Sequence, residues 1–191
     1  MSIAMEKSPH RGRITVDEYH RMAEVGLLAP DARVELIEGV IVDVPPMGPS
    51  HASAVSQLDE LLHNAVRERA IVWCQLPIRL SAFSEPQPDL ALLVGRADFY
   101  RQRHPTAEDI LLVIEVSDTS LRHDLSTKAA LYAQHGIREL WVVDVVAGGI
   151  HVFRHPSDGV YRGAFAPDTF DQMEIEALPG VTIDLSPVAS S

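Results

Sequence analysis

Residues 110–117 read ILLVIEVS, and this run limits the folds open to the chain more than any other feature of the sequence. A short apolar run bounded by polar loops is typical of a buried strand. Glu115 interrupts the pattern, because an ionised carboxylate is costly to bury unless it is paired or binds a metal. The run therefore predicts a strand in the interior of a sheet, and the carboxylate within this strand is expected to be paired or to bind a metal.

The segments on either side of this run alternate between helical and extended patterns. Helices are expected over 16–28, after a capping box at Thr15 and Glu18, over 51–70 and over 124–135, where Asp124 is a plausible N-cap. Strands are expected in a hairpin at 34–44, at 71–81 with an interruption at Pro77, and at 88–95, 110–117, 139–146, 150–155, 173–176 and 181–185. This order predicts an α/β fold with a mixed central sheet flanked by helices.

The pattern also suggests one domain and excludes two nucleotide-binding folds. Residues 14–186 are expected to form a single domain, between a flexible N-terminus at 1–13 and a flexible tail at 187–191. The strands and helices do not follow a regular βαβ order. The glycine patterns GxGxxG and GxxxxGK[ST] are absent from the sequence, so neither a dinucleotide fold nor a phosphate-binding loop is expected.

Composition and net charge limit the cellular location and the kinds of binding partner that are expected. Hydrophobic residues make up 46% of the 191 residues, as in globular proteins, and no apolar run reaches the roughly 20 residues of a membrane span. A lone cysteine, Cys74, and the lack of an apolar leader at the N-terminus favour a reduced, cytoplasmic location. The net charge of −11 disfavours a broad basic surface for nucleic acid. It is compatible with a carboxylate-lined metal site, or it serves only solubility.

Three apolar strands each carry one acid: Glu35 in the first, Asp89 after Pro88 in a later one, and Glu115 in the run above. A carboxylate near a strand end often only faces water or caps a helix, and for any one of the three that interpretation stays open. Lys128 lies one helical turn from both Asp124 and Tyr132. It is either a surface lysine paired with Asp124 or a cation that reaches towards Glu115.

Carboxylates from neighbouring strands suit Mg²⁺, which takes a few protein oxygens and keeps several waters. Such an ion lowers the pKa of a bound water and neutralises developing phosphate charge, and a nearby lysine can stabilise the same charge. These are the requirements for hydrolysis of a phosphodiester.

Pro88-Asp89 followed by Glu115-Val116-Ser117 resembles the PD-(D/E)XK nuclease motif. Ser117 stands where the orthodox motif has its lysine, and Lys128 resembles the version in which the lysine has moved to the following helix. From about residue 14 to 185 the chain resembles the Uma-type family of restriction endonuclease-like proteins. The matching stretches are ITVDEYHRM, RVELIEGVIV, QPDLALL and LLVIEVSDTSLRHDLSTKAALYAQHGIRELWVVD.

The resemblance implies a restriction endonuclease-like fold and an Mg²⁺- or Mn²⁺-dependent endonuclease that acts on DNA, often as a homodimer. It assigns Asp89 and Glu115 as metal ligands, Lys128 as the catalytic lysine, and Glu35 as a further acid of the catalytic site. The alternative is a catalytically silent domain on the same fold that serves self-association or partner binding. Hydrolysis of RNA or of another phosphate ester is a third possibility that the sequence does not separate from the first.

Several further polar and aromatic residues each have a structural and a functional interpretation. His51 begins the second expected helix and is either an ordinary first-turn residue, the favoured view, or a group that assists the site. Tyr132 is favoured as a core residue, and Asp144 as a strand end. The segment FYRQRH, residues 99–104, is favoured as a solvated loop over a DNA contact, and Arg122 and His123 flank the expected site.

Overall fold

The structure is a computed structural model that describes residues 12–189. Of the flexible ends expected at 1–13 and 187–191, residues 1–11 and 190–191 lie outside the described residues. These fall into two compact units, one made of residues 12–45 and 80–86, the other of residues 46–79 and 87–189. The single domain expected over 14–186 stays a prediction.

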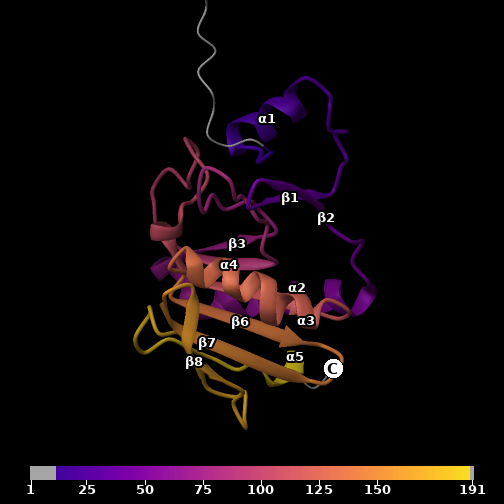
Figure 1. Cartoon of the computed structure of the whole chain (residues 1–191). Helices are drawn as coiled ribbons and strands as arrows, with labels where there is room; N and C mark the ends of the chain where they lie inside the picture. The colour runs from indigo at the N-terminus through magenta and orange to yellow at the C-terminus, as the bar shows by residue number, and fades with distance from the viewer. Residues whose placement is uncertain (1–11, 190–191) are drawn as a thin grey trace, which may run out of the picture. The chain divides into compact units, whose positions relative to one another are not determined.

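The smaller unit contains one helix and one hairpin (Figure 1). Helix α1, Val16–Glu24, begins at the expected capping box of Thr15 and Glu18, but ends four residues before the expected boundary. Strands β1, Val34–Ile37, and β2, Val40–Asp43, pair antiparallel. The two residues between them, Glu38 and Gly39, have φ angles of 51° and 80°. Two positive φ angles are what a two-residue type I′ hairpin turn requires, and Gly39 meets this without strain.

The larger unit is built on a six-stranded sheet of order β3-β4-β5-β6-β7-β8 (Figure 1). The strands are β3, Ala70–Cys74; β4, Leu90–Val94; β5, Ile110–Ser117; β6, Glu139–Asp144; β7, Gly149–Ser157; and β8, Val160–Phe165. Neighbouring strands are antiparallel except β5 and β6, which are parallel. The sheet is therefore mixed, as expected. β3 ends at Cys74, before Pro77, which cannot donate to a strand ladder.

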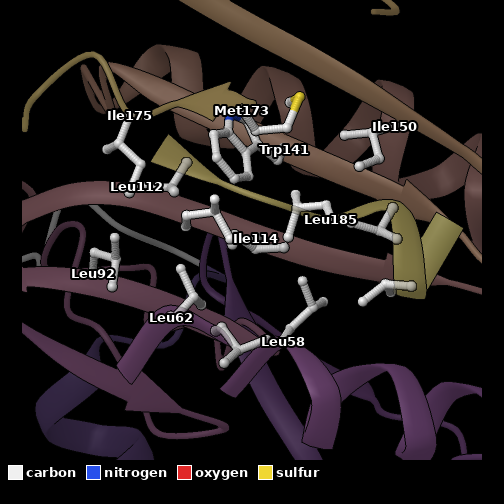
Figure 2. Close-up of a cluster of buried hydrophobic side chains, with 14 of the residues drawn as sticks. Leu58, Leu62, Leu92, Leu112, Ile114, Trp141, Ile150, Met173, Ile175 and Leu185 are labelled. Carbon is white, nitrogen blue, oxygen red and sulfur yellow. The ribbon is translucent and has the colours of Figure 1, made fainter. Parts of the chain in front are cut away.

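Helix α2, Pro49–Val66, covers one face of this sheet. Its apolar residues join alternate residues of the central strands in one buried cluster, which Figure 2 shows in part: Leu58, Leu62, Leu92, Leu112, Ile114 and Trp141. The short strands β9, Met173–Glu174, and β10, Thr182–Ile183, and the helix α5, Ser186–Ala189, close the cluster. Residues 187–189 were expected in a flexible tail; Val188 and Ala189 are instead buried.

A second helical segment contacts the opposite face of β5. It runs without interruption through α3, Leu121–His123, a π-helical turn, Asp124–Lys128, and α4, Ala129–Gln134. The expected start at Asp124 is wrong, since Asp124 has helical backbone angles (φ −68°, ψ −42°) and lies inside the segment. The 3₁₀ turns 67–69 and 107–109 complete the larger unit. No helix among residues 12–189 is long and apolar enough to cross a membrane.

Candidate active site

Three of the four residues of the expected site, Asp89, Glu115 and Lys128, lie at one edge of the six-stranded sheet. β5 and β6 are parallel and end at this edge, whereas β4 runs the other way and begins there. Leu90 pairs with Ile114 in the antiparallel ladder of β4 and β5. The next pair in this register is Asp89 and Glu115, and residues directly opposite in a ladder project to the same face. The fold thus places two acids that are 26 positions apart side by side.

Glu115 is buried, with 5% of its surface exposed. Lys128 Nζ donates to its Oε1 over 3.2 Å, and the hydroxyl of Tyr132 donates to the same oxygen over 2.5 Å. Both donors come from the helical segment that follows β5. The ammonium and the hydroxyl compensate the burial of this carboxylate, and Lys128 is the cation that reaches Glu115, one of the two interpretations open from the sequence.

Asp89 is held from three sides. The backbone N–H of Val116 donates to its Oδ2 over 2.9 Å, which fixes the acid against β5. His51 Nε2, from the first turn of α2, lies 2.8 Å from its Oδ1, and Gln75 Nε2, just after β3, lies 3.4 Å from the same oxygen. His51 was favoured as an ordinary helix residue, but it contacts a residue of the expected site.

Hydrogen bonds, and to a smaller extent nearby charges, shift the pKa values of two groups at this edge. The hydrogen bond with Asp89 raises the pKa of His51, and the negative charges of Asp89, Asp118 and Glu115 add to the effect against an opposing contribution from burial. The backbone N–H of Thr119 holds the pKa of Asp118 below its usual range. A histidine whose protonated form is favoured beside three acids indicates a strongly negative environment, such as a cation site requires.

Ser117 occupies the place of the orthodox lysine and has a structural contact instead. Its side chain is fully buried, and its hydroxyl donates to Asp124 Oδ2 in a very short hydrogen bond. Ser120 donates to the same oxygen over 2.6 Å. Asp124 therefore ties the end of β5 to the helical segment that carries Lys128, and does not cap a helix N-terminus.

Glu35 lies on β1 in the smaller unit, with 6% of its surface exposed. In the same unit, burial and then the negative charges of Glu85 and Glu35 raise the pKa of the Tyr19 hydroxyl. Asp89, Glu115 and Lys128 belong to the larger unit. The membership of Glu35 in the site stays a prediction.

The remaining candidates have local roles. Asp144 Oδ1 accepts hydrogen bonds from the backbone N–H groups of Val146 and Ala147, so this acid closes the turn after β6. In the loop 96–104, Arg96 pairs with Asp98 and Arg103 with Asp109. These ion pairs neutralise two of the loop's arginines, which supports the solvated-loop interpretation over a DNA contact.

Gln75 and Tyr132 contact the expected site although sequence reasoning did not place them there. Tyr132 was favoured as core, which is correct for its ring, since the residue has no exposed surface. Its spacing of four residues from Lys128 was a usable signal that both side chains face Glu115. Gln75 had no such signal, because its position depends on the loop after β3, where it adopts a positive φ of 50°.

The residues fit a hard divalent cation. Asp89 and Glu115 offer carboxylate oxygens, and within the larger unit no third His, Cys, Asp or Glu forms with either of them a group whose ligand atoms all lie within 4.8 Å. An ion held by these two carboxylates would complete its coordination with water. Mg²⁺ is bound in this way more often than by an all-protein cage.

Comparisons with known proteins identify the family and the fold of the chain. The sequence profile of the Uma2 family, described as "Putative restriction endonuclease", matches residues 16–186. The structure is similar to the crystal structure of a "putative nuclease belonging to DUF820" from Anabaena variabilis, with a TM-score of 0.71 and 17% sequence identity over 93% of this chain and 98% of that chain. No curated protein matches the sequence. The restriction endonuclease-like fold expected from the sequence is confirmed, and the chain belongs to the Uma2 family.

Proposed function

We propose that the protein is a metal-dependent endonuclease that hydrolyses phosphodiester bonds, with DNA as its substrate. The observation that carries the proposal is that Asp89 lies beside β5, where it accepts a hydrogen bond from the backbone N–H of Val116, the residue after Glu115. Lys128 Nζ lies 3.2 Å from Glu115 Oε1. Membership of a family described as restriction endonuclease supports the reaction class. DNA as the substrate rests on the family resemblance alone.

In this proposal Asp89 and Glu115 hold one Mg²⁺ or Mn²⁺ ion. When bound, the ion lowers the pKa of a water and neutralises charge on the phosphate. Lys128 has an ammonium at the same carboxylate, and it orients the attacking water or donates to a non-bridging phosphate oxygen. Water adds to phosphorus, the phosphorus–oxygen ester bond breaks, and the departing oxygen takes up a proton. Glu35 is proposed as a further acid of the catalytic site.

The test is cleavage of supercoiled plasmid with Mg²⁺ or Mn²⁺, beside an EDTA control. We expect nicking by the wild type and a loss of at least about 100-fold in the Asp89→Asn and Glu115→Gln variants, because each removes one of two ligand charges. The matched control is Asp158→Asn, which changes an acid whose side chain is 81% exposed in the turn between β7 and β8. If the ligand variants cut as fast as the control, the roles given to the two acids are wrong.

The second candidate is a silent domain of the same fold that serves self-association or partner binding. The net charge of −11 favours it, since a strongly acidic chain repels a polyanion. Two results together would select it: no cleavage of plasmid, single-stranded DNA or RNA with either metal, and no binding of Mn²⁺. We also propose a homodimer on the basis of the family resemblance. Light scattering after size exclusion should then give twice the chain mass of 21.0 kDa.

A further inference from the structure

We propose that Tyr132 is a positioning residue that fixes the Glu115 carboxylate for the metal, while Lys128 serves the reacting groups. The inference deepens the proposed function and rests on it. Both residues donate a hydrogen bond to Glu115, but their roles differ.

Tyr132 and Lys128 approach Glu115 from successive turns of one helical segment and donate to one oxygen. The Tyr132 hydroxyl lies 2.5 Å from Glu115 Oε1, and Lys128 Nζ lies 3.2 Å from it. Both contacts hold Oε1, so the position of this carboxylate oxygen is set by the helical segment that follows β5. A ligand carboxylate that is oriented in this way loses less conformational freedom when an ion binds.

The two donors differ in rigidity and in charge. Tyr132 has no exposed surface, and its ring turns about only two side-chain bonds, so the phenol stays where the packing places it. Lys128 keeps 11% of its side chain exposed and carries a compact charge on a flexible four-carbon stem. Only the lysine can turn towards a substrate during the reaction. The phenol is neutral, so it orients Glu115 without cancelling the negative charge that attracts the ion.

The test compares how tightly the Tyr132→Phe and Lys128→Met variants of the full chain bind Mn²⁺. Electron paramagnetic resonance measures the concentration of free Mn²⁺, which gives the affinity. We expect Tyr132→Phe to weaken binding by about 10-fold, the usual effect of losing a hydrogen bond to a metal ligand. Lys128→Met should bind Mn²⁺ at least as tightly as the wild type, because it removes a positive charge beside the ion, yet it should lose cleavage.

The matched control is Tyr100→Phe. Tyr100 is also buried, with 4% exposed, and its hydroxyl donates over 2.8 Å to the carbonyl of Val94, at the opposite end of β4 from Asp89. This variant loses one buried hydrogen bond and should keep the wild-type affinity for Mn²⁺. A general loosening of the fold would weaken binding in both tyrosine variants.

Three results would overturn the inference. The first is a Tyr132→Phe affinity within twofold of the wild type, which leaves the proposed nuclease function intact. The second is a Lys128→Met variant that binds Mn²⁺ about 10-fold more weakly than the wild type. This comparison with the wild type does not need a folded Tyr132→Phe variant. The third is a wild type that binds no Mn²⁺, which overturns the proposed function as well.

Discussion

Replacement of Lys128 by methionine should destabilise the protein in the absence of metal. The substitution keeps most of the apolar stem and removes the ammonium that lies 3.2 Å from Glu115, where the two side chains are 11% and 6% exposed. At an effective dielectric constant of about 20, two unit charges at this distance attract by about 5 kcal/mol. Breaking a buried pair by removing one partner typically costs about 3–5 kcal/mol, because the other charge is left buried. Tyr132 still donates to Glu115, so we expect the lower value, about 3 kcal/mol.

The assay is urea unfolding in EDTA, followed by circular dichroism. A second variant, Glu115→Gln with Lys128→Met, removes both charges and should recover at least about 1 kcal/mol of the loss, since a neutral pair leaves no uncompensated charge. The control is Arg162→Met, which breaks an ion pair whose side chains are 58% and 81% exposed and should change the free energy of unfolding by no more than about 0.5 kcal/mol. A cost below about 1 kcal/mol for Lys128→Met, or a double variant as unstable as the sum of its single changes, would refute the reasoning.

Two further predictions test the fold around the site. Burial acts to raise the pKa of Asp109, but the hydrogen bonds from Arg103 and Thr106 outweigh it and hold this pKa at about 2, below the usual 3.8. The ionised acid therefore stabilises the folded state above pH 4, and this stabilisation is lost as the pH falls towards 2. Asp109→Asn should therefore cost about 1–2 kcal/mol in urea unfolding at pH 7 and almost nothing at pH 2; an equal cost at both pH values would contradict the assignment. Gly148 has a φ of +66°, and a Cβ there would lie 2.4 Å from the carbonyl oxygen of Ala189, so Gly148→Ala should lower thermal stability markedly, whereas Gly149→Ala, which has open space around it, should not.

Local patterns predicted those parts of the fold that local energetics decide. The capping box at Thr15 and the two-residue turn at Glu38 and Gly39 formed as expected, because each depends on a few neighbouring residues. β8 was missed, although Asp158-Gly159 is a hairpin signal, because its alternation is weak around Gly163.

The site was predicted only where a residue carried its own anomaly. Glu115 drew notice because it is an acid in an apolar strand, and Lys128 because of its spacing on the following helix. Gln75 could not be found in this way, since its position depends on a loop after β3 and on tertiary packing. The contact of the Tyr132 hydroxyl was missed despite the spacing of four residues from Lys128, because the core alone explains an aromatic residue at helical spacing.

The π-helical turn at residues 124–128 sets which side chains meet β5. Such a turn holds one residue more than an α-helical turn, and each residue of an α-helix advances the winding by about 100°. Deleting a single residue between Asp124 and Lys128 would keep the helix but rotate everything after it relative to Ser117 and Asp124. Tyr132 and Lys128 would then no longer face the Glu115 carboxylate. The chemistry at this edge thus depends on the number of residues in one helical turn, even when the residues that form the site are unchanged.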